Sequence, residues 1–138
     1  MLVTADLHTH SAYSFDADYD PAQMLAAAAE DGLRQICITD HVDFYTPSDV
    51  HLPDFAARSA RLAQLRGQFP QLTVLEGAEV SMTTDPARAR SAMAALDGVK
   101  LDFVIGSVHT IGAENVWADA FYASRTREAA YRLYLETI

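Results

Sequence analysis

Residues 20–41, DPAQMLAAAAEDGLRQICITDH, carry the signals of a helix followed by a buried strand. Asp20 is placed to cap the helix, Pro21 suits its first turn, and Gly32 suits its exit. The run RQICIT that follows is short, apolar and rich in β-branched residues, which predicts a buried strand. A helix that leads into a buried strand is the repeating unit of α/β proteins.

The same alternation extends outward over the whole chain. Strands are expected at about residues 2–8, 34–39, 72–80 and 101–109, and helices at about residues 20–32, 53–68, 85–98 and 124–138. Asp85 and Pro86 repeat the helix entry found at Asp20 and Pro21. Strands that alternate with helices form βαβ units around a parallel sheet, so the predicted fold class is α/β.

Composition limits the class of protein. The chain has 138 residues, of which 50% are hydrophobic and 21% are charged, as expected for one soluble globular domain or part of a larger one. No apolar run approaches the roughly 20 residues of a membrane span, and no secretory leader precedes the first strand, so we expect a cytoplasmic protein without a membrane partner. The net charge of −9 argues against nucleic acid as a partner. Cys37 lies in an apolar run and is expected to fill the core.

Histidine and acidic side chains stand at the ends of the expected strands. His8 and His10 close the first strand, His41 follows the second, Glu79 lies near the end of the third, and His109 ends the fourth. Side chains alternate along a strand, so His8 and His10 share one face. The carboxyl ends of parallel strands meet at one edge of a sheet, where α/β folds build their sites. We therefore expect these side chains to converge.

Imidazole and carboxylate groups in this arrangement predict a metal site. Zinc, manganese and iron are the ions that such a mixed ligand set suits best. Six candidates exceed the needs of one tetrahedral ion, so two or three divalent ions are expected, and the two oxygens of Glu79 allow it to bridge a pair. The candidate ligands are His8, His10, Asp16, His41, Glu79 and His109.

Each of these signals taken alone has a simpler structural explanation, and only their conjunction on successive strands favours metal. His51 fits no strand end and is predicted to be a surface or loop residue that could still line a pocket. Asp40 points away from His41 and is expected to cap or support a ligand rather than bind metal. The helix expected at about residues 53–68 carries three arginines, Arg58, Arg61 and Arg66, which are interpreted as its solvated face.

Four segments, in this order and spacing, carry a recognisable pattern: DLHTHSAYSFD at residues 6–16, GLRQICITDHVDF at 32–44, LEGAEVS at 75–81 and DFVIGSVHTI at 102–111. Together they resemble the PHP (polymerase and histidinol phosphatase) superfamily. The TDHVDF and IGSVH forms look most like its histidinol-phosphatase branch. The amidohydrolases also begin with His-x-His on a first strand, but they are a weaker match to the later candidate ligands.

The resemblance implies a distorted, TIM-like (β/α)7 barrel around a trinuclear metal centre that hydrolyses phosphate esters. By that resemblance the candidate ligands are assigned to the three ions as follows: His8 and His10 to the first, Glu79 as the bridging carboxylate, His109 to the second, and Asp16 and His41 to the third. A metal-bound water is then the expected nucleophile. No serine in the sequence is marked as a side-chain nucleophile by a base and an orienting group.

Length sets a limit on the predicted barrel. A (β/α) barrel takes about 250 residues, and the family pattern continues with further histidine and aspartate ligands that this sequence does not contain. We expect residues 1–138 to form the first half of a single PHP domain. Its two open sheet edges would then require the remaining half of the barrel or a partner chain.

The expected activity of the complete domain is hydrolysis of a small phosphate ester. Histidinol phosphate, an intermediate of histidine biosynthesis, is the preferred substrate by resemblance, and nucleotides or other small phosphomonoesters remain open. The alternatives are a non-catalytic metal-binding or interaction module, and a segment that is only a piece of a longer protein.

Overall fold

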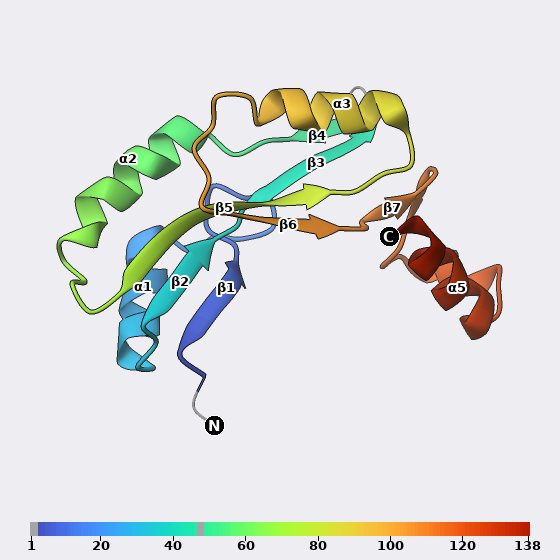
Figure 1. Cartoon of the computed structure of the whole chain (residues 1–138). Helices are drawn as coiled ribbons and strands as arrows, with labels where there is room; N and C mark the ends of the chain where they lie inside the picture. The colour runs from blue at the N-terminus through green and yellow to red at the C-terminus, as the bar shows by residue number, and fades with distance from the viewer. Residues whose placement is uncertain (1–2, 47–48) are drawn as a thin grey trace.

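The computed structural model describes residues 3–46 and 49–138, and it places helices around a sheet of mainly parallel strands (Figure 1). In chain order the elements are β1 (Ala5–Thr9), α1 (Pro21–Glu30), β2 (Gln35–Ile38), β3 (His41–Thr46), β4 (Asp49–His51), α2 (Phe55–Arg66), β5 (Thr73–Ser81), α3 (Pro86–Ala95), β6 (Phe103–Ser107), β7 (Thr110–Ile111), β8 (Glu114–Asn115), α4 (Asp119–Ala123) and α5 (Arg127–Thr137). Leu2, predicted to begin the first strand, lies outside the described residues.

Four strands lie side by side in the order in which the chain forms them: β1, β2, β5 and β6 (Figure 1). All pairings in this row are parallel. β3 continues the line of β2, because β2 pairs with residues 73–76 of β5 and β3 pairs with residues 79–80 of the same strand. In a (β/α) barrel each new strand of the chain is added at the same edge of the sheet, whereas in a doubly wound sheet the direction of addition reverses part-way. The predicted α/β fold of the PHP type is confirmed, and the described strands form an open sheet.

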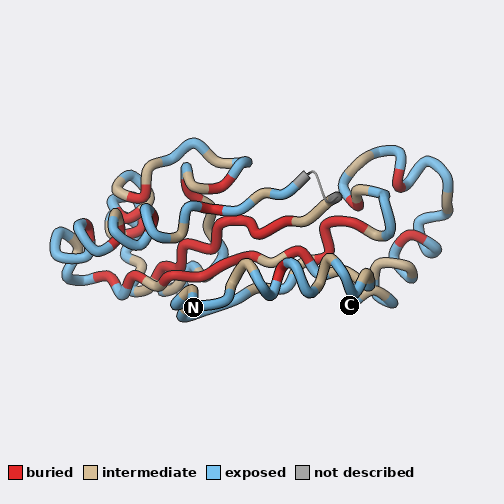
Figure 2. Tube along the Cα trace, turned by 90° about the horizontal axis from the view of Figure 1, so that it is seen from above, coloured by how far each residue is buried: buried red, intermediate tan, exposed pale blue. Residues whose placement is uncertain are grey.

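One face of the sheet is covered by α1 and α2 (Figure 1). Asp20 caps α1 as predicted: it accepts a hydrogen bond from the Ala22 N–H in a capping box with Gln23, and Pro21 occupies the first turn. Figure 2 shows burial concentrated along the central strands. The main core, between these helices and strands, comprises Leu25, Ala28, Ile36, Ile38, Leu62, Leu65, Leu72 and Val74. The sheet is thereby fixed from one side, and its carboxyl ends remain available for a site.

Several of the predicted boundaries are wrong. The fourth strand, expected to end at His109, ends at Ser107. His41, expected simply to follow the second strand, begins a separate strand, β3, which forms an antiparallel hairpin with β4 that the sequence did not indicate. α2 begins at Phe55 rather than Pro53, because the Asp54 carboxylate accepts a hydrogen bond from the Ala57 N–H and so caps the helix there.

A short helix that was not predicted, α4, precedes the expected last helix, which is α5. Ser124, predicted to begin it, ends α4, and Thr126 caps α5 by accepting a hydrogen bond from the Ala129 N–H. Together with the β7–β8 hairpin, these helices pack around a second, smaller cluster of Val108, Val116, Phe121 and Ala130. None of the helices in the described part of the chain is long and apolar enough to cross a membrane.

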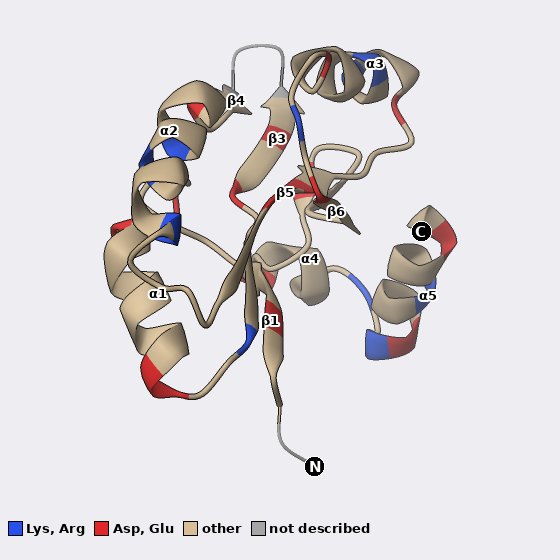
Figure 3. Cartoon of the chain, turned by 60° about the vertical axis from the view of Figure 1, so that its left-hand side comes forward, with Lys and Arg blue, Asp and Glu red and all other residues tan. Residues whose placement is uncertain are grey.

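The solvated face predicted for the three arginines of α2, drawn blue in Figure 3, is wrong for Arg58, whereas Arg61 is half-buried and Arg66 is exposed. Arg58 is completely buried, and its Nη1 donates a hydrogen bond to Asp40 at 3.0 Å. The other two also form ion pairs, each at 2.8 Å: Arg61 with Asp20 and Arg66 with Glu76. Helical periodicity could not reveal these pairs, because the acidic partners come from other elements.

Candidate metal centre

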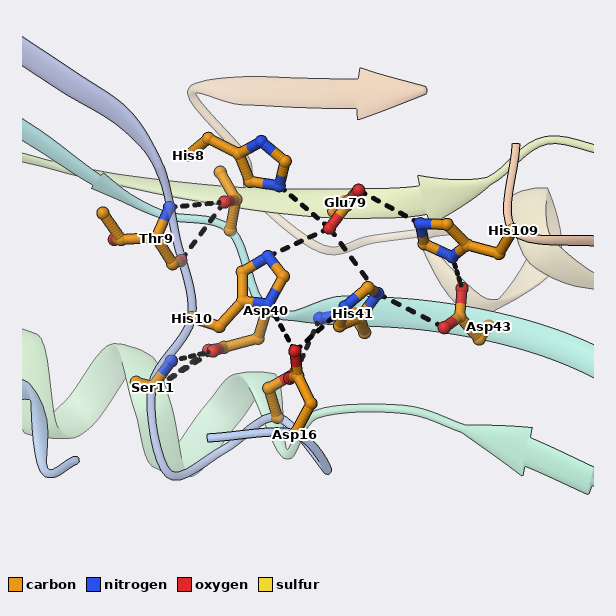
Figure 4. Close-up of polar contacts among 12 residues, drawn as sticks. His8, Thr9, His10, Ser11, Asp16, Asp40, His41, Asp43, Glu79 and His109 are labelled. Carbon is orange, nitrogen blue, oxygen red and sulfur yellow. Dashed lines mark hydrogen bonds and ion pairs between the residues drawn. The ribbon is translucent and has the colours of Figure 1, made fainter. Parts of the chain in front are cut away.

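The carboxyl ends of the parallel strands meet at a pocket of about 430 Å³, which all six predicted ligands line (Figure 4). Phe15 and Trp117 line the same pocket. The ligands come from several segments: His8 from β1, His10 from the residue after β1, Asp16 from the β1–α1 loop, His41 from the start of β3, Glu79 from β5, and His109 from the second residue after β6. The predicted convergence of these side chains is therefore present in the fold.

Glu79 is almost fully buried and lies at the centre of this group (Figure 4). Its Oε2 lies 3.0 Å from His8 Nε2 and 2.9 Å from His10 Nε2. Its Oε1 lies 3.1 Å from His109 Nε2. The two oxygens of one carboxylate thus face imidazoles from opposite ends of the strand row, which is the geometry a bridging ligand requires.

Gly77 allows the strands around Glu79 to approach closely. A Cβ atom at Gly77 would lie 2.7 Å from Cys37 Sγ and 2.8 Å from the carbonyl oxygen of Phe103, so a larger residue would push β5 away from β2 and β6. Cys37 is fully buried, as predicted, and burial raises the pKa of its thiol to about 11. This tight packing fixes β5 two residues before Glu79.

A second part of the pocket is organised around Asp16. Its Oδ2 lies 3.0 Å from His10 Nδ1 and 3.3 Å from His41 Nε2. The Ser14 hydroxyl donates a hydrogen bond to Asp16 Oδ1 at 2.7 Å and accepts one from the His41 N–H at 3.2 Å. The loop after β1 is thereby tied to β3, and His10 stands between two carboxylates, those of Asp16 and Glu79.

Asp43 is a residue of this site that was not predicted. It is completely buried; its Oδ1 lies 2.8 Å from His109 Nδ1, and its Oδ2 lies 3.2 Å from His41 Nδ1. A carboxylate at Nδ1 of His109 leaves Nε2 directed into the pocket, which is the usual support of a metal-binding histidine. The signal was available in the sequence, because His41 and Asp43 are two residues apart and so share one face of a strand.

The nitrogen and oxygen atoms that line the pocket are better placed to bind divalent cations than to form hydrogen bonds with one another. Among the described residues that line the pocket, His10 Nε2, His41 Nδ1 and Glu79 Oε2 are buried without a hydrogen-bond partner, although both nitrogens lie within ion-pair distance of Glu79 Oε2. Buried polar atoms normally have such a partner, and a cation that accepts their lone pairs would satisfy all three. Three groups have ligand atoms within 4.8 Å of one another: His8, His10 and Glu79; His10, Asp16 and His41; and His41, Asp43 and His109.

The close contacts among these side chains also shift their pKa values when no metal is bound. The close contact with the Glu79 carboxylate, aided by Asp16 and opposed by burial, raises the pKa of His10 to about 9. Burial lowers the pKa of His109, but hydrogen bonds to Asp43 and Glu79 outweigh burial and raise the pKa to about 9. Burial also raises the pKa values of Glu79 and Asp43, yet histidine hydrogen bonds hold both well below their usual range. The carboxylates are therefore ionised at neutral pH, and a cation must compete with protons for the histidines.

The model of the PHP domain matches residues 6–138 of this chain. The chain belongs to the PHP family. Over 135 residues this PHP chain is 33% identical to a histidinol-phosphatase of Lactococcus lactis subsp. lactis (strain IL1403), covering 94% of this chain and 48% of the relative. It is 22% identical to a probable histidinol-phosphatase of Clostridium acetobutylicum over 133 residues, covering 96% of this chain and 50% of that protein. An error-prone DNA polymerase of Nocardia farcinica is 36% identical over 96 residues, which are 68% of this chain and 7% of the polymerase.

A solved structure also resembles the PHP chain. The crystal structure of histidinol phosphate phosphatase from Lactococcus lactis, complexed with zinc, L-histidinol and phosphate, matches 99% of this chain and 52% of that chain, with a TM-score of 0.88 and 32% sequence identity. The predicted resemblance to the histidinol-phosphatase branch is confirmed. The PHP chain spans about half the length of the histidinol-phosphatase relatives it matches.

The prediction that His51 lies in a loop is wrong, whereas the alternative that it lines a pocket agrees with the fold. His51 ends β4, and its ring lies 4.3 Å from the ring of Phe15. It lines a second pocket of about 260 Å³, which Tyr13, Phe15 and His41 also line. Because Phe15 and His41 line both pockets, this second pocket adjoins the candidate metal centre. The β3–β4 hairpin, which the sequence did not indicate, is what brings His51 there.

Proposed function

We propose that this PHP chain supplies ligands for two or three divalent cations, and that the whole protein uses them to hydrolyse a small phosphomonoester of the histidinol phosphate type. The observation that carries the proposal is the convergence of the predicted ligands around buried nitrogen and oxygen atoms that have no hydrogen-bond partner. Zinc, manganese and iron are the proposed ions, because the ligands combine imidazole and carboxylate. The proposed ligands are His8, His10, Asp16, His41, Glu79 and His109.

The contacts suggest how these residues divide the work. Glu79 would face two ions, since Oε2 points to His8 and His10 while Oε1 points to His109. His109 would bind through Nε2, because its Nδ1 is occupied by Asp43 at 2.8 Å. The other side of His10 faces Asp16 and His41, which form the remaining group.

Bound cations would supply Lewis acidity to the phosphate oxygens and would activate the attacking water. The chain's own part is to hold the ligands and to exclude solvent from one side of the pocket. Glu79 and Asp43 are buried at that side, whereas the His8 side chain is 51% exposed at the other. Phosphate would therefore approach from the side of His8.

The identity of the substrate is supported by the relatives and by the pocket wall. One relative is named a histidinol-phosphatase and another a probable histidinol-phosphatase. The similar solved structure contains L-histidinol and phosphate. Phe15 and Trp117 line the pocket and are each about half exposed, so they can contact a flat ring on the leaving group. The net charge of −9 favours a small ester over long nucleic acid. A cytoplasmic location is part of the same proposal.

A metal-binding module without turnover is the second candidate, and the exposure of β6 favours it. Phe103 and Val104 point to opposite faces of this strand and are 38% and 50% exposed. The sheet therefore needs further cover, which we infer comes from the remaining half of the barrel or from a partner chain. Without that cover, the chain would hold cations but would not enclose a substrate.

The test measures metal content and phosphatase activity in the protein at its natural length, with the variants Glu79→Gln and Glu76→Gln. Glu76 is the matched control because it lies on β5 and is nearly as buried, but it faces α2 and pairs with Arg66. Wild type and Glu76→Gln are expected to hold two or three metal equivalents and to hydrolyse L-histidinol phosphate. A chelator and Glu79→Gln should each abolish hydrolysis.

Two other outcomes decide between the candidates. Bound metal without hydrolysis of L-histidinol phosphate, a nucleoside monophosphate or p-nitrophenyl phosphate would support the metal-binding module. Full turnover by protein that has been stripped of metal would contradict both.

A further inference from the structure

Arg58 of α2 is the largest fully buried side chain in the described part of the chain. Its Nη1 donates to Asp40 Oδ2 at 3.0 Å, and its Nη2 donates to the carbonyl oxygen of Gly77 at 2.7 Å. Asp40 is also completely buried. A buried ion pair is a costly device, because each charge loses its hydration, so it is weak evidence for stability alone. The position of this pair indicates another role.

Asp40 extends the contact to the loop that follows β1 (Figure 4). Its Oδ1 accepts hydrogen bonds from the Ser11 N–H at 2.6 Å and from the Ser11 hydroxyl at 3.0 Å. Ser11 is itself completely buried. Arg58 and Asp40 thus connect α2, the loop after β1, the short connection between β2 and β3, and β5.

Each anchor of this network lies beside a proposed metal ligand: Ser11 follows His10, Asp40 precedes His41, and Gly77 comes two residues before Glu79. We propose that Arg58 and Asp40 are positioning residues that hold these three segments at the spacing a cation requires. The inference rests on the proposed metal centre. It adds that the affinity for metal depends on a buried pair for which the described residues show no hydrogen bond or ion pair to a ligand side chain.

Arg66 offers a matched control on the same helix. Its Nη2 donates to the carbonyl oxygen of Val74 at 3.2 Å and to Glu76 Oε1 at 2.8 Å. Arg66 therefore repeats the pattern of Arg58, with one backbone carbonyl of β5 and one carboxylate. Both contacts are to β5, at residues 74 and 76, on the side that α2 covers. Through these contacts Arg66 does not connect β5 to another segment that carries a proposed ligand.

The experiment measures zinc affinity by competition with a chromophoric chelator, using the protein at its natural length. The variants are Arg58→Met, Arg66→Met and the double variant Arg58→Met/Asp40→Asn, and each affinity is scaled to the folded fraction measured by circular dichroism. Arg58→Met should weaken zinc binding about 10- to 100-fold, as loss of a ligand-supporting contact does. Arg66→Met should stay within about twofold of wild type. The double variant should regain thermal stability without regaining zinc affinity, because it removes the stranded charge but not the loss of positioning.

Each contrary result has a definite meaning. Equal zinc affinity in Arg58→Met and Arg66→Met would overturn the positioning role, while zinc binding by wild type would leave the proposed function intact. Recovery of affinity in the double variant would also overturn it, since the defect would then be a stranded charge. Wild type that binds no cation would contradict the proposed function and this inference together. If Arg58→Met does not fold, Arg58→Lys can replace it, because lysine keeps the charge but lacks the planar fork of the guanidinium. A zinc affinity of Arg58→Lys below that of wild type would support the inference, and an equal affinity would overturn it.

Discussion

The two central strands of the parallel row differ from the two outer strands. β2 and β5 are buried over most of their length, because neighbours pair with both of their edges and helices cover one face. β1 and β6 carry no fully buried residue. The proposed ligands follow this division, since Glu79 on β5 is 4% exposed whereas the His8 side chain on β1 is 51% exposed. The central strands fix the centre of the site, and the outer strands depend on what covers them.

Replacing a central ligand should therefore cost more than replacing an outer one. We expect Glu79→Gln to lower kcat/KM by at least about 10³-fold, roughly 4 kcal/mol of transition-state stabilisation, because four imidazoles lie within ion-pair distance of Glu79. His8→Asn should cost about 10- to 100-fold, because the ligands on the central strands remain. Steady-state kinetics on L-histidinol phosphate at saturating zinc would compare the two. A larger loss for His8→Asn would contradict the division between central and outer strands.

Leu62→Ala probes the covered face of the central strands. Leu62 is completely buried in the core between the helices and the sheet. Truncation should lower the free energy of unfolding by about 3 kcal/mol, the usual cost of lost burial plus a cavity. Urea denaturation of metal-free protein measures this change, and a loss below 1 kcal/mol would show that the face is not packed as described.

Asp43→Asn tests the support beneath the ligands. The amide keeps the shape but not the charge that Asp43 presents to His41 and His109. We expect metal affinity to fall about 10- to 100-fold. Asp85→Asn is a suitable control, because it alters an acid of similar type at the cap of α3, outside the pocket. Equal affinities in the two variants would remove Asp43 from the site.

The pH dependence should have opposite signs with and without metal. The pKa values of His10 and His109 are raised from 6.5 to about 9, so their stabilising contribution is complete below pH 6.5 and is lost as pH rises through 9. The lowered pKa of Glu79 contributes stability above its ordinary value of 4.5, and that stability is lost as pH falls. Metal-free protein should thus be most stable between about pH 5 and 6.5.

Metal affinity should instead rise between pH 6.5 and 9, by up to about tenfold per pH unit for each proton displaced. Urea titrations in chelator and zinc titrations at pH 6, 7.5 and 9 would measure both trends. A metal affinity that does not change over this range would show that His10 and His109 give up no protons to the metal.

The smallest effect is expected on the outer strand. Val104 on β6 is 50% exposed, so Val104→Thr should change the free energy of unfolding of the 138-residue chain by less than about 0.5 kcal/mol. The same substitution should reduce self-association in light scattering, because it makes an uncovered strand face more polar. A cost similar to that of Leu62→Ala would mean that β6 is packed on both faces.

Sequence reasoning succeeded where the signal is local. The cap at Asp20, the buried run around Cys37 and the alternation of His8 with His10 are set by neighbouring residues, and these predictions agree with the fold. Placing His41 and Glu79 in one site needed only the rule that parallel strands end at the same edge.

The sequence could not reveal features that depend on distant partners. From the sequence, Arg58 is expected to lie on the solvent-exposed face of a helix. Only the fold shows that it is buried against Asp40 and Gly77. The chain leaves strand conformation at Thr39 and Asp40, between β2 and β3, although β5 pairs with both strands. Asp43 was predictable from its spacing to His41, but the unrecognised strand β3 concealed it.

The proposed function requires imidazoles and a carboxylate from separate strands to bind shared cations. Anomalous X-ray diffraction at the zinc edge, on crystals of the zinc-loaded protein at its natural length, would locate these cations. We expect zinc peaks within about 2.0–2.2 Å of Glu79 and of His8, His10 or His109 ring nitrogens. Well-ordered density for these side chains, without a zinc peak at bonding distance from any of them, would contradict the proposed function.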